Sequence, residues 1–313
     1  MSTILITGGT GLIGTALSHM LTEKGYEVIL LSRRPAGAGQ GAVRTAHWDP
    51  AAGTIDPEAI RSADHIIHLA GAGVADKRWN AKRKKEILES RTGSSALIIK
   101  ALKDIPNKVK TVISASGIGW YGPDPAIPNP HPFEETDPVD DDFLGETCRL
   151  WEGSIAEVTA MGKRLVILRT GVALSSKGGA LAEFRKPVKL GVAAILGSGR
   201  QVVSWIHIED LCRLYLQVIE DSAWTGIYNA VAPQPVDNRN LTLELAKRLK
   251  GKYFVPVYIP SILLKIAVGE LSVEVLKSAT VSAKKTRQAG FQFIYPSIGS
   301  ALDNLVAPLR DQT

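Results

Sequence analysis

Short apolar runs alternate with longer amphipathic segments through the first two thirds of the chain. The apolar runs have the length and residue types of buried strands. The segments between them are long enough to be helices that cross from one parallel strand to the next. This alternation predicts an α/β fold, a doubly wound parallel sheet with helices on both faces. The predicted strands are Ile4–Thr7, Glu27–Ser32, His65–Leu69, Val109–Ser114 and Leu165–Arg169, and the predicted helices are Leu12–Lys24, Lys82–Lys103 and Phe143–Met161.

The pattern changes after Ala230, where short apolar pieces are interrupted by several prolines. Proline punctuates regular elements, so this stretch is typical of a separate, smaller α+β unit. We therefore expect two domains, a large sheet domain over residues 1–230 and a cap over residues 231–313 that contributes to substrate binding. Two irregular stretches, Pro35–Gly41 and Pro123–Pro138, are predicted surface loops. The second follows the carboxyl end of a strand, where doubly wound sheets bind ligands, so it is a candidate lid.

A glycine-rich loop joins the first predicted strand to the first predicted helix. Gly8 permits the tight turn, Gly11 lets a pyrophosphate approach the backbone, and Gly14 lets helix and strand pack closely. The start of the helix supplies oriented N–H donors and a positive dipole. The loop therefore predicts a dinucleotide site, and Thr10, Leu12 and Ile13 are expected to contact the nucleotide with these glycines.

The end of the second strand bears on the choice of dinucleotide. A site for NAD usually has Asp or Glu there to hold the ribose 2′-hydroxyl. This chain has Ser32, Arg33 and Arg34 instead, and a hydroxyl and a guanidinium suit a 2′-phosphate. The sequence therefore predicts NADP(H). Asp49 is a candidate acceptor from the adenine amino group, although Asp before Pro50 is also an ordinary turn residue.

Composition and charge exclude several kinds of protein and of binding partner. Two cysteines in 313 residues cannot form a disulfide framework, and no Cys/His cluster has the spacing of a zinc site, so we expect no metal and a reducing, cytoplasmic location. No apolar stretch reaches the length of a membrane span, and no membrane association is expected. The net charge of +6 favours anionic ligands. Nucleic acid is not expected as a partner, because the basic run Lys82–Lys85 is typical of a solvated helix face.

Three motifs in order carry a family resemblance: TGGTGLIG from Thr7, HLAG from His68 and SASGIGWYG from Ser114. They resemble the extended short-chain dehydrogenase/reductases, the NAD(P)-dependent epimerase/dehydratase family, whose fold is the Rossmann fold. RTGVALS from Arg169 and GSGRQVVSWIHIEDL from Gly197 resemble an atypical subgroup. Its members are called epimerase-family or cell-division-inhibitor-like proteins and carry a C-terminal domain of unknown function.

The resemblance implies roles for several residues. Typical members use a Ser that orients the substrate and a Tyr-x-x-x-Lys pair that transfers the proton and holds the nicotinamide ribose. Ser116 matches the Ser, whereas Leu144 and Cys148 stand where the pair is expected. Tyr121 is a substitute acid, although an aromatic residue here is more typical of packing. Leu69, Ala70, Gly71 and Arg169 are assigned to the cofactor site.

The substrate side of the site has two candidates. Trp79 follows the loop after a predicted strand and is expected at the mouth of the cleft, and Arg200 lies in a donor-rich loop that suits an anionic group. Val203 stands where sugar-nucleotide epimerases have a diphosphate-binding Arg, which disfavours a nucleotide sugar. We expect an NADP(H)-dependent oxidoreductase or epimerase-like protein acting on an unknown small molecule. The alternative is a non-catalytic NADP(H)-binding regulator or redox sensor with a protein partner. The sequence leaves the oligomeric state undetermined.

Overall fold

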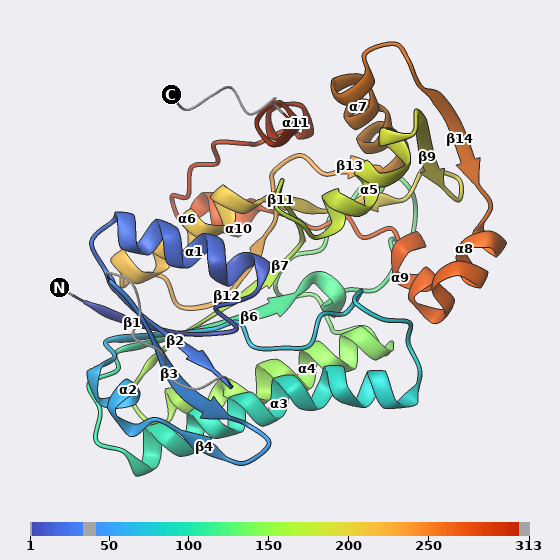
Figure 1. Ribbon diagram of the computed structural model, residues 1–313. Coiled ribbons are helices and arrows are strands. Elements are labelled where there is room, and N and C mark those ends of the chain that lie inside the picture. The colour runs from blue at the N-terminus through green and yellow to red at the C-terminus, as the bar shows by residue number, and fades with distance from the viewer. Residues whose placement is uncertain (1, 34–41, 307–313) are drawn as a thin grey trace.

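An eight-stranded sheet forms the centre of the chain in the computed structural model, which describes residues 2–33 and 42–306 (Figure 1). The strand order is β12-β7-β6-β5-β1-β2-β3-β4, and all neighbours are parallel except β3 and β4. The order reverses between β1 and β5, the switch point at which such sheets bind ligands. The predicted doubly wound Rossmann sheet is confirmed. The strands are β1 Thr3–Thr7, β2 Glu27–Ser32, β3 Val43–Asp49, β4 Thr54–Ile55, β5 His65–His68, β6 Thr111–Gly117, β7 Arg164–Thr170 and β12 Gly226–Ala230.

Two groups of helices cover the sheet. Helices α1 (Leu12–Glu23) and α6 (Ile208–Glu220) pack on one face, where Leu17 and Leu21 join a fully buried apolar cluster with the strand residues. Helices α2 (Pro57–Ser62), α3 (Ala81–Asp104) and α4 (Phe143–Ile155) cover the other face. Their apolar residues recur at helical spacing, so each helix turns one stripe toward the sheet.

Several elements of the sheet domain differ from the predicted ones, among them one helix and one strand. The helix expected over 143–161 ends at Ile155 and continues as a 3₁₀ turn, Ala156–Thr159. The strand Val43–Asp49 was not among the predicted strands. Its side chains are buried only at Ala46 and Trp48, because it lies near the edge of the sheet, and its apolar signal is correspondingly weak.

A third apolar cluster, apart from those on the two faces of the sheet, forms the core of the cap. Its buried residues run from Leu174 to Trp205 and again from Ala232 to Val306, so an internal segment of the chain packs with the C-terminal one. The division at residue 230 stays a prediction about independent domains. The cap contains β8 Val172–Leu174, α5 Ala180–Lys189, β9 Val192–Leu196, β10 Val202–Val203, β11 Trp205–His207, β13 Val236–Asp237, α7 Asn238–Lys250, β14 Val255–Ile259, α8 Ser261–Val268, a 3₁₀ turn Gly269–Leu271, α9 Ser272–Leu276, α10 Lys284–Gln288 and α11 Ile298–Val306.

The proline-rich loop after β6 is tied to the cap. The Asp124 carboxylate accepts hydrogen bonds from the hydroxyls of Ser278 (2.7 Å) and Thr280 (2.8 Å), from the Thr280 amide (2.9 Å) and from Asn129 (2.9 Å). A carboxylate that accepts four hydrogen bonds holds its loop firmly. The structure therefore shows this predicted lid as an anchored bridge between the sheet domain and the cap.

Candidate functional site

At the glycine-rich loop after β1, the backbone of Gly8 and Gly14 lies in direct contact with other backbone atoms. Gly8 has φ +70°, and a Cβ there would lie 2.8 Å from the Leu69 carbonyl group. A Cβ on Gly14 would lie 2.5 Å from the Gly8 oxygen. Gly11 is the N-cap of α1 and makes no side-chain cap hydrogen bond. The first turn of α1 thus keeps N–H donors for an anionic ligand.

A second loop faces this helix start. Residues 175–179, between β8 and α5, line a pocket of about 530 Å³ together with Thr10, Gly11 and Leu12. The loop carries Lys177, which has no carboxylate partner among the described residues. Gly179 caps α5 without a side-chain hydrogen bond, so a second helix start lies next to the first. Two helix dipoles and one lysine make this pocket electropositive. The glycines and lysine of SSKGG were the available sequence signal.

The end of β2 presents no carboxylate. Ser32 is the last residue of β2 and Arg33 follows it on the surface, whereas Arg34 lies outside the described residues. Asp49 ends the neighbouring strand β3, and its carboxylate accepts a hydrogen bond from the Ala51 amide (2.9 Å). That bond is the ordinary turn role of an Asp. Its contact with adenine stays a prediction.

The loop after β5 packs over a buried arginine, Arg91. The amides of Leu69 and Ala70 both donate to the Thr7 hydroxyl at 3.1 Å, which fixes the start of the loop. Arg91 of α3 is 9% exposed and donates to the Ala72 carbonyl at 3.0 Å. A Cβ on Gly71 would lie 3.0 Å from the Arg91 guanidinium carbon, so the loop and the guanidinium are in close contact here. Arg91 was not predicted from the sequence.

A buried ion pair stands at the end of β6 and β7. Arg169 is 1% exposed, and its Nε and Nη2 donate to the two carboxylate oxygens of Glu152 at 2.8 and 3.0 Å. The guanidinium carbon also lies 3.6 Å from the centre of the Trp120 ring. Burial opposes the charged form, but the hydrogen bonds and charge of Glu152 outweigh it and raise the pKa of Arg169. Arg169 is therefore engaged within the protein, and its contact with the cofactor stays a prediction.

Both predicted catalytic residues join this ion pair. The Ser116 hydroxyl donates to Glu152 Oε1 at 2.7 Å. The Tyr121 side chain is fully buried, its hydroxyl donates to Asn229 Oδ1 at 2.7 Å and accepts from Arg169 at 3.2 Å, and burial raises its pKa to about 12. The structure thus gives Tyr121 the packing role considered for it. Ser116 keeps its acceptor lone pairs, while its proton is directed at Glu152.

Leu144 and Cys148 lie on α4 next to the same strand end. Leu144 packs against Gly119, where a Cβ would be 2.9 Å from the leucine Cβ. The Cys148 thiol donates to the Gly117 carbonyl at 3.5 Å, and burial together with the charge of Glu152 raises its pKa to about 11. A thiol held neutral is a poor nucleophile. Helix α4 contains neither Tyr nor Lys.

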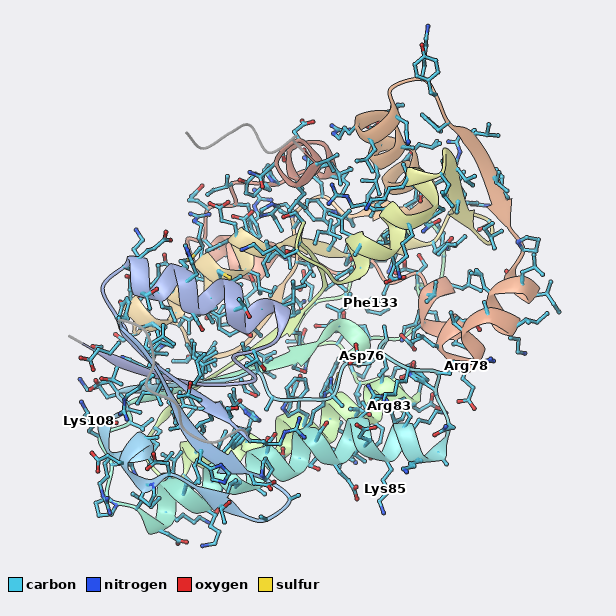
Figure 2. All side chains as sticks on the ribbon, viewed as in Figure 1. Asp76, Arg78, Arg83, Lys85, Lys108 and Phe133 are labelled. Carbon is cyan, nitrogen blue, oxygen red and sulfur yellow. The ribbon has the colours of Figure 1, made fainter. Side chains whose placement is uncertain are left out.

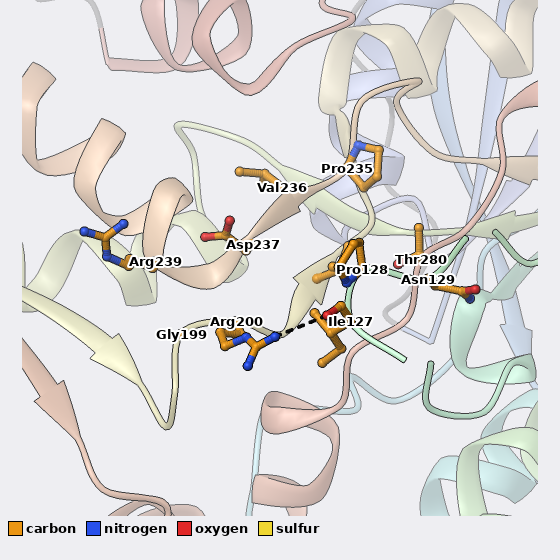
Figure 3. A pocket seen from close by; sticks show the side chains of 11 residues that line it. Ile127, Pro128, Asn129, Gly199, Arg200, Pro235, Val236, Asp237, Arg239 and Thr280 are labelled. Carbon is orange, nitrogen blue, oxygen red and sulfur yellow. Dashed lines mark hydrogen bonds between the residues drawn. The ribbon is translucent and has the colours of Figure 1, made fainter. Parts of the chain in front are cut away.

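The two predicted substrate residues lie on different walls. Trp79 stands on the sheet-domain side, where its ring meets Phe143 edge-on at 5.0 Å. On the same side, Arg83 lies 3.7 Å from the Asp76 carboxylate (Figure 2) and donates to the Gly73 carbonyl. Arg200 lies on the cap side and lines a pocket of about 460 Å³ with Arg239, among others (Figure 3). Its Nη2 donates to the Ile127 carbonyl at 3.2 Å, which bridges the cap and the proline-rich loop.

Residues 4–230 match the NAD dependent epimerase/dehydratase family, and residues 259–305 match a domain of unknown function, DUF1731. The chain belongs to the NAD dependent epimerase/dehydratase family. This confirms the resemblance given by the three motifs. Most of the cap thus consists of DUF1731 and an internal segment of the epimerase region.

Several known proteins of similar length match this chain. Human epimerase family protein SDR39U1 is 32% identical over 308 residues, which are 97% of this chain and 99% of the relative. Epimerase family protein YfhF of Bacillus subtilis is 34% identical over 304 residues, 97% and 98% of the two chains. A crystal structure of human SDR39U1 (isoform 2) with NADPH superposes with a TM-score of 0.84 and 30% identity over 97% and 99% of the chains. This epimerase-family chain is thus similar to its relatives over nearly its whole length.

The ion pair yields a stability prediction. Glu152→Gln leaves the Arg169 guanidinium buried without a carboxylate, so the free energy of unfolding should fall by about 3–5 kcal/mol. Urea unfolding followed by circular dichroism measures this change. Glu146→Gln is the matched control, because Glu146 lies on the same helix and pairs with Arg149 at the surface. The control should leave stability unchanged. Equal unfolding midpoints for the two variants would show that the buried pair contributes nothing.

The glycine loop yields a second prediction. Gly11→Val should fold, because φ is −77° there and a Cβ meets only the Gly8 oxygen, at 3.3 Å. Its side chain should still exclude a pyrophosphate and lower NADPH affinity at least tenfold in calorimetry. Gly14→Val should instead lower stability by about 2–3 kcal/mol, because its Cβ overlaps backbone atoms. Unchanged affinity in Gly11→Val would place the nucleotide elsewhere.

Proposed function

We propose that this protein binds NADP(H) across the carboxyl edge of its sheet and uses it in oxidoreductase or epimerase-like chemistry on a small molecule. The observation that carries the proposal is the uncapped start of α1 at Gly11, with the electropositive 175–179 loop on one side and the carboxylate-free end of β2 on the other. The relative crystallised with NADPH supports the choice of cofactor.

The described residues fit a phosphorylated dinucleotide. Gly11 offers backbone donors and no side chain in the way, which suits a pyrophosphate. Lys177 adds a cation on the opposite wall of the pocket. Ser32 and Arg33 would hold the 2′-phosphate, since a guanidinium pairs with phosphate through charge-assisted hydrogen bonds. Leu69, Ala70 and Gly71 would lie against the cofactor from the end of β5, a position that Arg91 and Thr7 hold rigid.

When bound, the cofactor supplies a hydride donor or acceptor. The chain's own contribution is positioning. Glu152 directs the Ser116 proton inward, which leaves the hydroxyl oxygen as an acceptor for a substrate hydroxyl. Tyr121 and Arg169 fix the wall behind it. No Tyr-Lys pair stands on α4, so a proton in the reaction would come from water or from the substrate, and turnover should be slow.

The second candidate function is a non-catalytic NADP(H)-binding regulator or redox sensor. Leu144 and the neutral Cys148 thiol favour it, because the positions expected to carry acid chemistry hold groups that cannot supply it. The two functions differ in one observable. Only the enzyme would convert a suitable metabolite, with net oxidation of NADPH if it is an oxidoreductase and without it if it is an epimerase. Ser116→Ala should then slow that conversion while leaving NADPH affinity intact.

Cofactor preference tests the proposal directly. NADPH should bind at least tenfold more tightly than NADH, a difference of about 1.4 kcal/mol, because only NADPH carries the phosphate that Ser32 and Arg33 suit. Titration calorimetry with both cofactors measures the ratio. Arg33→Asp should shrink or invert it, since the new carboxylate repels the phosphate and suits a ribose hydroxyl.

The matched control is Arg61→Asp, which makes the same charge change on the surface of α2. The control should keep the wild-type ratio. Equal affinities for NADPH and NADH in the unaltered protein would overturn the assignment of the 2′-phosphate site. A ratio that falls as much in the control as in Arg33→Asp would assign the preference to net charge alone.

A further inference from the structure

One end of the cap exposes an unusual amount of apolar surface. Of the eleven large hydrophobic residues that are exposed in the described part of the chain, eight lie between residues 253 and 273. Figure 1 shows β14 along the outer edge of the cap and α8 at its end. Six of these side chains lie on β14, on α8 or just before β14, are 52–77% exposed, and form what we call the β14–α8 surface: Tyr253, Val255, Tyr258, Ile262, Leu263 and Ile266.

Helix α8 has no buried residue, although its sequence, SILLKIAV, contains a single charge. An ordinary surface helix buries its apolar stripe against the core. Here Ile262 and Ile266, one turn apart, are 67% and 66% exposed. Monomeric soluble proteins rarely leave a continuous apolar area of more than a few hundred Å² in water. The β14–α8 surface is therefore expected to be covered when the protein works.

Strand addition by another protein is disfavoured at this edge. β14 pairs only with β9, and the amides and carbonyls of Val255 and Ile259 are directed at β9. The residues directed at the free edge include Pro256 and Pro260, which have no N–H to donate. Proline on an edge strand blocks further pairing. A partner that covers this surface must therefore contact its side chains, because it cannot add a strand to β14.

The charge of the β14–α8 surface indicates which kind of partner covers it. The stretch from Lys250 to Val268 contains three lysines and no Asp or Glu. Lys250, Lys252 and Lys265 have no carboxylate partner within the described residues. The next carboxylates along the chain, Glu270 and Glu274, are already paired with Lys84 and Lys277. A second copy packed symmetrically on this surface would bring lysines toward lysines, which is repulsive, whereas an anionic surface would attract them.

We propose that the β14–α8 surface docks on an anionic lipid bilayer, which departs from the expectation of no membrane association drawn from the sequence. Its aliphatic side chains would enter the acyl boundary, its tyrosines would lie at the level of the headgroups, and its lysines would meet lipid phosphates and carboxylates. α8 is about 12 Å long at 1.5 Å per residue, so it lies in the interface and does not cross it. In the described part of the chain, no helix is long and apolar enough to cross a bilayer. The proposal is independent of the cofactor.

Docking would leave the sheet domain in water. Arg78 lies against Gly269 and Lys84 pairs with Glu270, so the turn after α8 also contacts the residues that precede and begin α3. Figure 2 shows Arg78 beneath this part of the cap. The membrane surface would therefore lie next to the wall that carries Trp79, on the outer side of the molecule.

Vesicle co-sedimentation tests the proposal. The full-length protein should bind vesicles of phosphatidylcholine with 30% phosphatidylserine, about tenfold or more tightly than vesicles of phosphatidylcholine alone. The double change Ile262→Asp and Ile266→Asp should abolish binding, and its circular dichroism melting curve should match the wild type because neither side chain is buried. Lys252→Gln with Lys265→Gln should weaken binding about fivefold per lysine. Ile294→Asp is the control, an exposed isoleucine outside this surface.

Three results would overturn the proposal. The first is no sedimentation with either vesicle. The second is binding that survives the Ile262 and Ile266 changes, which would place the contact elsewhere. The third is a protein that ignores vesicles but forms a dimer by light scattering, with the dimer lost in the same double variant. That result would assign the surface to a second copy of the chain.

Discussion

The buried pair of Glu152 and Arg169 is the interaction on which the rest of the site depends. Two charges taken out of water must be paired and hydrogen-bonded, and here both carboxylate oxygens and the guanidinium are satisfied. The pair joins α4 to β7 and fixes Ser116 on β6 between them. Through Tyr121 and Asn229 it reaches the cap, because the Asn229 side chain donates to the Ser282 carbonyl. One ion pair therefore sets the relative position of sheet, helix and cap at the strand ends where a ligand would bind.

Much of the sheet domain could be predicted from the sequence, because its strands are buried on both faces. β1, β2, β5 and β7 match apolar runs to within a residue or two, and the glycines at 8, 11 and 14 mark the first turn. The packing of the cap could not be predicted from the local pattern, and the division at residue 230 stays a prediction. Its core combines Leu174–Trp205 with the C-terminal segment, a pairing of distant stretches that local periodicity does not encode.

The sequence likewise predicted one part of the candidate site and not the other. The phosphate-binding features follow from local backbone geometry, so a short motif predicts them. The absence of a carboxylate after β2 can also be read directly from the sequence. The roles of Ser116, Tyr121 and Arg169 depend on which side chains meet across three elements. No local signal in the sequence showed that Glu152 would accept a hydrogen bond from Ser116 and neutralise Arg169. Arg91 was missed because its role comes from the loop after β5, which lies over it. Lys177 was missed because its own loop meets the start of α1 only in the folded chain.

The most direct test of this account is a crystal structure of the protein with NADPH. The account predicts the pyrophosphate over Gly11, the 2′-phosphate against Ser32 and Arg33, and a nicotinamide ribose that no tyrosine–lysine pair holds, with Glu152 and Arg169 still paired. A pyrophosphate bound away from the start of α1 would contradict it. A Tyr121 hydroxyl that points out of the core and contacts the nicotinamide ribose would also contradict it. Tyr121 would then be a catalytic residue, and its buried hydrogen bonds would belong only to the protein without cofactor.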